Sequence, residues 1–127
     1  MATVLVVDDS KIMRVNVRRM LEKLGQEVVG EAENGFISIA KYEKCMPDFV
    51  TMDITMPEEK GIKDGIDAVA KIIEKFPKAK IIMVTSHGEQ DKVIRAIKAG
   101  AKGYMLKPIK EDEIRSKIEK LGFTIEQ

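Results

Sequence analysis

Residues 4–11 read VLVVDDSK, in which four apolar residues run directly into two adjacent carboxylates, Asp8 and Asp9. A short apolar run that does not alternate with polar residues is typical of a strand buried on both faces, as in a parallel sheet. Two negative charges side by side repel each other, and a raised pKa or a bound cation relieves such repulsion. The stretch therefore predicts a buried parallel strand that ends at a charged site.

Similar apolar runs recur along the chain, and a helical pattern follows each of them. Together with residues 3–7, the runs are 27–30, 49–52, 80–85 and 103–106. The apolar helix faces are Met13, Val17, Met20, Leu21 and Leu24; Phe36, Ile39 and Ala40; Ile66, Val69, Ala70 and Ile73; Val93, Ala96 and Ile97; and Ile114, Ile118 and Leu121. This alternation indicates an α/β fold, a (βα)5 doubly wound, five-stranded parallel sheet with helices on both faces.

The length and composition narrow the class of protein. The 127 residues suit one domain, so we expect a single domain over 1–127 with no output domain. The 22 basic and 21 acidic residues nearly cancel, which argues against nucleic-acid binding. Cys45 is the single cysteine, which favours a reducing compartment. No apolar run approaches the roughly 20 residues of a membrane span, and no signal peptide opens the chain, so we expect a cytoplasmic protein.

Acidic residues follow two of the predicted strands. Ligands of open α/β sheets bind at the carboxyl ends of the strands, where the strand order reverses. In the order 2-1-3-4-5, the first and third strands flank that point, so Asp8, Asp9 and Asp53 would converge there. Mg²⁺ prefers such oxygen ligands, and Mn²⁺ is a second candidate. We therefore interpret the doubled aspartate as half of a metal site.

The ends of the fourth and fifth strands are suited to a phosphate. Thr85 offers a hydroxyl to one phosphate oxygen, and Lys107 offers a positive charge to another. A carboxylate beside a bound cation can act as a nucleophile and form an aspartyl phosphate. Asp53 is the candidate nucleophile, because it stands alone on the central strand. Positioning and charge neutralisation are most of what phosphoryl transfer requires.

Four segments carry a family resemblance. The segments VLVVDDSKIMR (4–14), FVTMDITMP (49–57), IIMVTS (81–86) and GYMLKP (103–108) resemble the receiver domain of two-component response regulators. The resemblance covers the chain from end to end and is of the stand-alone, CheY-like chemotaxis type. The strand order 2-1-3-4-5 is the order of that family, so the expected convergence of the three aspartates leans on the resemblance.

The resemblance implies a chemical role for each matching acidic residue. Asp53 would be the phosphoacceptor, taking a phosphoryl group from a histidine kinase. Asp9, Asp53 and the backbone carbonyl of Thr55 would bind Mg²⁺ directly, and Asp8 would bind it through water. Apart from catalysing its own phosphorylation and dephosphorylation, the protein would not be an enzyme.

The resemblance also implies a conformational switch. On phosphorylation the Thr85 hydroxyl would move toward the phosphoryl group and Tyr104 would turn inward. Lys107 would be the characteristic lysine of the family, and a cis peptide would join it to Pro108. The downstream partner would be a flagellar motor switch, or else a phosphotransfer or adaptor protein. A phosphatase would be a further partner. The downstream target would bind the face of the fourth helix, fifth strand and fifth helix, which includes Lys92, Arg95, Lys98, Tyr104 and Lys117.

Two segments depart from the family pattern. The family commonly reads Met-Pro-x-x-Asp-Gly after the phosphoacceptor, whereas residues 56–65 read MPEEKGIKDG, which is four residues longer. This loop over Glu58–Gly65 is either a tolerated surface insertion or a segment that alters kinase or phosphatase docking or covers the site. Ile109 stands where the family often has Phe, which we expect to affect packing only. The roles of the Thr55 side chain and of His87 stay open.

Other classes of function remain to be weighed. A phosphohydrolase of the haloacid-dehalogenase type needs a second aspartate two residues after the first, where this chain has Thr55. A flavodoxin-like carrier needs a hydroxyl- and glycine-rich loop after the first strand, where Asp8 and Asp9 lie. A phosphorelay receiver, an adaptor-binding receiver and an unphosphorylated scaffold stay open as alternatives to chemotaxis.

Overall fold

The computed structural model describes residues 1–125, over which strands and helices alternate along the chain. They are β1 (Thr3–Val7), α1 (Lys11–Lys23), β2 (Glu27–Ala32), α2 (Gly35–Cys45), β3 (Phe49–Asp53), α3 (Gly65–Lys75), β4 (Ile81–Thr85), α4 (Gln90–Ala99), β5 (Gly103–Leu106) and α5 (Glu111–Lys120). β1 and β5 have the predicted bounds, and β2 and β3 extend beyond the predicted 27–30 and 49–52.

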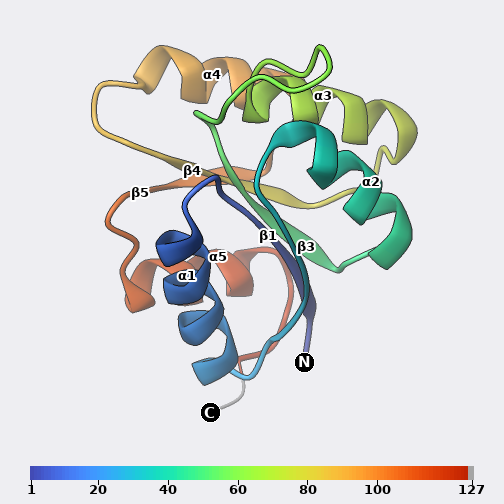
Figure 1. The fold of residues 1–127 in the computed structure, drawn as a ribbon. Helices are drawn as coiled ribbons and strands as arrows, with labels where there is room; N and C mark the ends of the chain where they lie inside the picture. The colour runs from blue at the N-terminus through green and yellow to red at the C-terminus, as the bar shows by residue number, and fades with distance from the viewer. Residues whose placement is uncertain (126–127) are drawn as a thin grey trace.

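The strands over residues 1–125 form one parallel sheet in the order β2-β1-β3-β4-β5. Helices α1 and α5 cover one face of the sheet, and α2, α3 and α4 cover the other (Figure 1). Alternate side chains of β1 divide between the two cores: Val4 and Val6 pack toward α1 and α5, and Leu5 and Val7 pack toward the other helices. The predicted doubly wound α/β fold is confirmed.

The central and edge strands differ in burial. β1, β3 and β4 are buried almost throughout, whereas β2 and β5 are partly exposed along most of their length. The expectation that every strand is buried on both faces is therefore wrong at the edges. An edge strand has a neighbouring strand on one side only, and the helices cover it less completely.

The predicted apolar face of α2 is partly wrong. Ser38 and Tyr42 form its buried side, while Phe36 is 37% exposed and Ala40 is exposed. Packing of the Tyr42 ring against Phe76, with ring centroids 5.1 Å apart, accounts for this orientation of the helix.

The other helices follow their predicted faces to different extents. The faces predicted for α1 and α5 are confirmed, with Val17 and Ile114 among their buried residues. On α4, Ala96 is buried but Ile97 is 43% exposed. On α3, Ala70 is exposed, although the rest of its predicted face is buried or packs against the core.

Polar residues that follow strands begin the next helices. Ser10, Asn34 and Asp64 each accept a hydrogen bond from the backbone N–H three residues later, at 3.3, 2.8 and 3.0 Å. Such side-chain caps satisfy N–H groups that the first turn of a helix leaves unpaired. They place the starts of α1, α2 and α3 directly beside the carboxyl ends of the strands.

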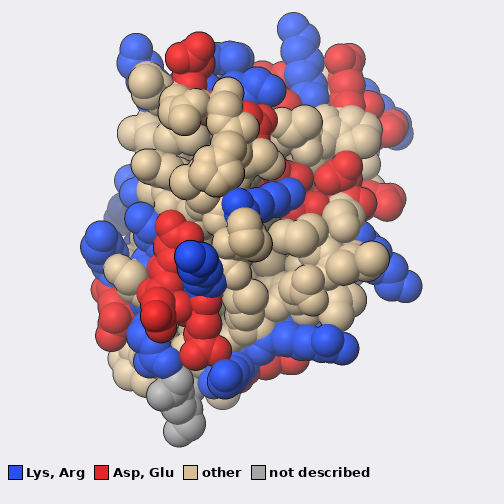
Figure 2. All heavy atoms as spheres, turned by 90° about the vertical axis from the view of Figure 1, so that its left-hand side faces the viewer, with Lys and Arg blue, Asp and Glu red and all other residues tan. Residues whose placement is uncertain are grey.

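The surface carries charges of both signs. Figure 2 shows the left-hand side of Figure 1, where basic and acidic side chains are interspersed around a broad uncharged area. This arrangement differs from the single basic surface typical of nucleic-acid binding. Within residues 1–125, no helix combines the length and the apolar character that a membrane crossing requires.

Candidate functional site

Three carboxylates meet where β1 and β3 end. One oxygen from each of Asp8, Asp9 and Asp53 lies within 4.8 Å of the others. Asp8 and Asp53 are 3% and 4% exposed, whereas Asp9 is open to solvent. The two strands are neighbours in register, with Val7 opposite Met52, so the residues that follow them lie side by side. The predicted convergence of the three aspartates is confirmed.

The backbone around Asp8 is held by residues of β2 and of the start of α1. Its N–H donates to the carbonyl of Ala32 at 3.0 Å, and its carboxylate accepts from the N–H of Ser10 at 2.8 Å. Its own carbonyl accepts from Arg14 Nη1 at 2.6 Å, and Arg14 Nε donates to Glu31 at 3.1 Å. Arg14 was not among the residues predicted from the sequence, although its place in the first turn of the helix after Asp8 was an available signal.

Lys107 is the cation of this cluster. Its Nζ lies 3.2 Å from Asp8 Oδ2 and 3.4 Å from Asp53 Oδ2. Its backbone N–H donates to the carbonyl of Thr85 at 2.8 Å, and the Lys107–Pro108 peptide is cis, as the resemblance implied. Burial lowers the pKa of Lys107, but the charges of Asp53 and Asp8 outweigh burial and raise it. The ammonium therefore stays charged at neutral pH and neutralises part of the cluster.

Asp53 resists ionisation. Burial is the main cause, the negative charge of Asp8 adds to it, and Lys107 opposes both; together they raise the pKa of Asp53 from 3.8 to about 7. When all groups are ionised, three carboxylates face one ammonium, so the cluster carries a net charge of −3 + 1 = −2. Hard oxygen donors with uncompensated negative charge fit Mg²⁺ or a similar divalent cation.

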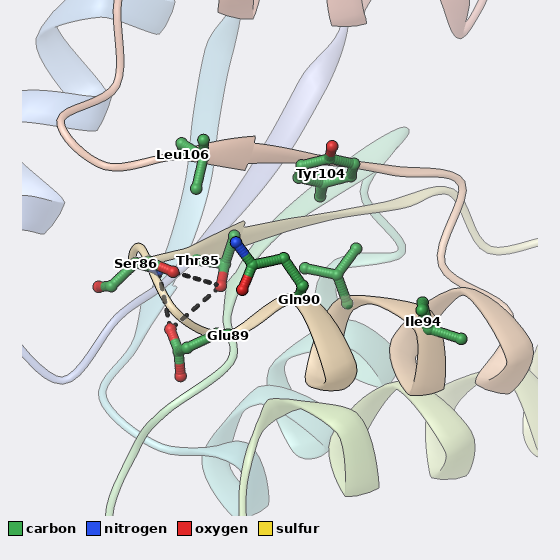
Figure 3. Close-up of a pocket in the computed structure, with 8 residues that line it drawn as sticks. Thr85, Ser86, Glu89, Gln90, Ile94, Tyr104 and Leu106 are labelled. Carbon is green, nitrogen blue, oxygen red and sulfur yellow. Dashed lines mark hydrogen bonds between the residues drawn. The ribbon is translucent and has the colours of Figure 1, made fainter.

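Glu89 belongs to the site, although it was not among the residues predicted from the sequence. Its Oε1 accepts from the Thr85 hydroxyl at 3.0 Å and from the N–H of Ser86 at 2.8 Å (Figure 3). Its Oε2 accepts from the Thr55 hydroxyl at 2.6 Å and from Lys92 at 3.4 Å. Its position four residues after Thr85, just before α4, was the available signal.

These contacts keep the Glu89 carboxylate charged. Burial opposes its ionisation, but the hydrogen bonds from Thr55, the N–H of Ser86, Thr85 and Lys92 lower its pKa to about 2. A charged acceptor strengthens the hydrogen bonds that it receives. The carboxylate of Glu89 therefore ties the end of β4 to the loop after β3.

The remaining predicted residues lie around this core of the site. Thr85 ends β4 and is 1% exposed, and its hydroxyl is bonded to Glu89. Tyr104 is 43% exposed on β5, with the Lys117 ammonium 5.7 Å from its ring centroid. His87 is exposed in the loop after β4.

The longer loop after β3 packs against the protein. Glu59 and Ile62 pair through two backbone hydrogen bonds of 3.1 and 3.0 Å across a turn at Lys60 and Gly61, both with positive φ. The Lys60 ammonium lies 4.9 Å from the ring centroid of Phe36 on α2, and Ile62 packs against the core below α2 and α3. The insertion therefore forms a small hairpin against the start of α2.

Gly65 joins this loop to the site. Its N–H donates to the carbonyl of Ile54 at 2.8 Å, and a Cβ added at Gly65 would overlap the backbone carbonyl oxygen of Asp53. Only a residue without a Cβ allows α3 to begin so close to Asp53.

The fold and the site together define a CheY-like α/β protein with an acidic, cation-fitting site at the switch point of its sheet. Comparison with known protein families agrees with this class. The family model of the response regulator receiver domain matches residues 4–119, and the chain belongs to this family.

Relatives of known function share nearly the whole length of the chain. The chemotaxis protein CheY of Thermotoga maritima is 45% identical, covering 94% of this chain and 96% of the relative. The chemotaxis protein CheY of Bacillus subtilis is 46% identical, covering 92% and 94%. A solved CheX–CheY–BeF3–Mg²⁺ complex from Borrelia burgdorferi has a TM-score of 0.87 at 27% identity, covering 96% of this chain and 90% of the solved chain.

Proposed function

We propose that the protein is a phosphorylation-activated signalling switch that accepts a phosphoryl group on Asp53 from a histidine kinase, with Mg²⁺. The observation that carries this proposal is the meeting of Asp8, Asp9 and Asp53 beside the ammonium of Lys107. The arrangement supplies a nucleophile, a cation site and a fixed positive charge in one place, which phosphoryl transfer requires.

The residues of the chain have distinct parts in the transfer. A carboxylate oxygen of Asp53 attacks the phosphorus of a phosphohistidine; the P–N bond breaks, and the imidazole leaves with the electron pair and takes up a proton. Lys107 is placed to compensate the charge on one phosphoryl oxygen, and Thr85 supplies a hydroxyl for another. In dephosphorylation, water attacks the phosphorus, the bond to Asp53 breaks, and inorganic phosphate leaves.

The cation would be held by the same acidic residues. Asp9, Asp53 and the backbone carbonyl of Thr55 would bind Mg²⁺ directly, and Asp8 would bind it through water. The cation supplies neutralisation of the negative charge shared by the nucleophile and the phosphoryl group. Mn²⁺ suits the same oxygen donors.

Chemotaxis is the process we propose, because relatives of nearly the same length are named chemotaxis proteins. A cytoplasmic location and the flagellar motor switch as the target belong to the same proposal. The target would bind the face of α4, β5 and α5. Support comes from exposed apolar side chains on this face, since Ile94, Ile97 and Leu106 are 56%, 43% and 36% exposed. The helices of this face also carry basic residues, namely Lys92, Arg95, Lys98 and Lys117. A phosphatase is a further class of partner.

Intact mass after mixing the protein with Mg²⁺ and acetyl phosphate tests the proposal. We expect a gain of one phosphoryl group that is lost in Asp53→Asn and in a sample treated with a chelator. Asp48→Asn, at an exposed carboxylate before β3, is the matched control and should gain the group normally. A gain of the same size in Asp53→Asn would contradict the assignment of the phosphoacceptor.

A further inference from the structure

The carboxylate of Glu89 bridges two hydroxyls that flank the end of β3. Thr55 lies two residues past Asp53 in the loop after β3, and Thr85 ends β4, which pairs with β3 at Asp53 and Val84. Each oxygen of Glu89 accepts from one of the two hydroxyls, at 2.6 and 3.0 Å. Both hydroxyls are thereby directed to a group outside the cluster of three aspartates.

We propose that Glu89 is a latch that holds the Thr85 hydroxyl away from Asp53 and thereby weakens the binding of a phosphoryl group at the site. The inference rests on the proposed function, because it assigns a positioning residue to the same site. Glu89 acts through Thr85, and it does not itself contact the reacting atoms.

Competition for a single proton is the first part of the mechanism. A threonine hydroxyl has one proton to donate, and the nearer acceptor for the Thr85 hydroxyl is the charged Glu89 Oε1 at 3.0 Å, with the carbonyl oxygen of Ser86 at 3.3 Å. Donation to a phosphoryl oxygen on Asp53 requires that this bond break. A hydrogen bond to a charged acceptor is stronger than one between neutral groups, so the latch opposes the phosphorylated state.

The contacts of Glu89 also connect the latch to α4. Glu89 immediately precedes this helix, and its carboxylate accepts from the N–H of Ser86 and from Lys92 in the first turns. Release of Thr85 removes one of the hydrogen bonds that hold the Glu89 carboxylate, which favours movement of the loop before α4. Lys92, which pairs with Glu89 at 3.4 Å, is one of the basic residues on the proposed target face.

The structure provides space for this movement beside Thr85. A cavity of about 300 Å³ lies between α4 and β5, bordered by Thr85, Glu89, Ile94, Tyr104 and Leu106 among others. In Figure 3, Thr85 and Glu89 lie at one end of this cavity and Tyr104 lies above the start of α4. Rearrangement of the loop around Glu89 therefore changes the surroundings of Tyr104 as well.

The test measures binding of beryllofluoride, a tetrahedral mimic of a phosphoryl group, to the Mg²⁺-saturated protein by calorimetry. Glu89→Ala should bind beryllofluoride about five- to tenfold more tightly than the unmodified protein, because Thr85 is released beforehand. Glu89→Gln, which keeps the shape of the side chain and removes its charge, should bind about two- to threefold more tightly. Thermal unfolding of each variant confirms that it is folded.

The second part of the test asks whether the effect passes through the Thr85 hydroxyl. In a Thr85→Val background, Glu89→Ala should give no gain in affinity, because there is no hydroxyl to release. A general loosening of the loop would give the same gain in both backgrounds. Asp91→Asn, which removes an exposed charge from the first turn of the same helix, is the matched control and should leave the affinity unchanged.

The outcomes separate this inference from the proposed function. If the unmodified protein binds no beryllofluoride, the proposed function fails and the latch fails with it. If the unmodified protein binds it but neither Glu89 variant binds more tightly, the latch alone is overturned. An equal gain in the Thr85→Val background, or in Asp91→Asn, also overturns it.

Discussion

Single side chains at the ends of the strands determine the chemistry of this protein. Asp53 is buried beside the charge of Asp8, and Lys107 compensates both only in part. The site therefore holds excess negative charge in a poorly solvated place, a state that a divalent cation or a proton relieves. Arg14 and Glu89, which hold the surrounding backbone and Thr85, extend the site beyond the residues with a direct chemical role.

Removal of the Asp53 carboxyl should change how stability depends on pH. Its pKa is about 7 in the folded protein and 3.8 in the unfolded chain. Between these values the folded state binds more protons, so the stability of the unmodified protein should fall as pH rises from about 4 to 7. The Asp53→Asn variant has no carboxyl group to ionise here, so its stability should not fall in this way. It should be more stable than the unmodified protein by ~2–4 kcal/mol at pH 8, with a much smaller difference at pH 4.

Urea unfolding with chelator at pH 4, 6 and 8 measures this difference. Asp112→Asn, at an exposed carboxylate on α5, controls for the loss of one negative charge. A stability gain of Asp53→Asn that is the same at every pH would contradict the raised pKa of Asp53.

Lys107 should matter for the phosphoryl group more than for the metal. Lys107→Ala removes the cation that competes for Asp8 and Asp53, so Mg²⁺ should bind at least as tightly as before. Beryllofluoride should bind at least about tenfold more weakly, because the Lys107 ammonium that would face one of its fluorine atoms is removed. Calorimetry measures both, with Lys110→Ala, on the exposed surface nearby, as the control. An equal loss of both affinities would show that the variant is simply distorted.

At the scale of elements, the β3–α3 loop forms a small hairpin of its own next to the site. Its extra residues form a hairpin against the start of α2, and Gly65 brings the start of α3 against the backbone of Asp53. The insertion thus contacts α2 through Lys60 at its turn, and Gly65 at its end contacts the backbone of β3. The interpretation of the loop as a tolerated surface insertion agrees with this packing, while an effect on kinase or phosphatase docking, or a covering of the site, stays a prediction.

Gly65→Ala should be strongly destabilising. The added Cβ overlaps the carbonyl of Asp53, and backbone shifts of this kind in a packed region cost about 1–3 kcal/mol or more. Gly61→Ala is the matched control in the same loop: its φ of +85° disfavours alanine, but no atom lies within 4 Å of the added Cβ. It should cost only about 1 kcal/mol. Urea unfolding measures the loss of stability in both variants. A smaller loss for Gly65→Ala than for Gly61→Ala would contradict the close approach of α3 to the backbone of Asp53.

At the scale of the whole molecule, the acidic site lowers the stability of the fold that positions it. β1 and β3, at whose ends the aspartates lie, are also the centre of the sheet and of both cores. Repulsion at their ends therefore opposes the folded state, and any ligand that binds only the folded state stabilises it. Folding and cation binding should be coupled for this reason.

Mg²⁺ should raise the melting temperature. At 10 mM MgCl₂ we expect a rise of about 2–5 °C at neutral pH, relative to NaCl of the same ionic strength. Asp9→Ala should lose most of this rise, because it removes an exposed ligand without disturbing the core. Glu33→Gln, at an exposed carboxylate after β2, is the control and should keep the rise. A rise that survives in Asp9→Ala would place the cation elsewhere.

The fold class could be predicted from the sequence because it follows from local patterns, and the acidic centre could be predicted from those patterns together with the strand order that the family resemblance implied. Apolar runs that end in Asp8, Asp53, Thr85 and Lys107, with a helix after each strand, require the carboxyl ends to meet at one edge of a parallel sheet. Periodicity also predicted the buried faces of α1 and α5, whose apolar residues recur at a regular spacing.

Only the tertiary structure decided the features that depend on contacts between distant segments. The rotation of α2 depends on the packing of Tyr42 against Phe76, and Gly65 is required by the approach of α3 to Asp53. The bond from Thr85 to Glu89 depends on how the loop before α4 folds back. A sequence pattern records the spacing of residues along one element, but it does not record which side chains of neighbouring elements compete for the same proton or the same space.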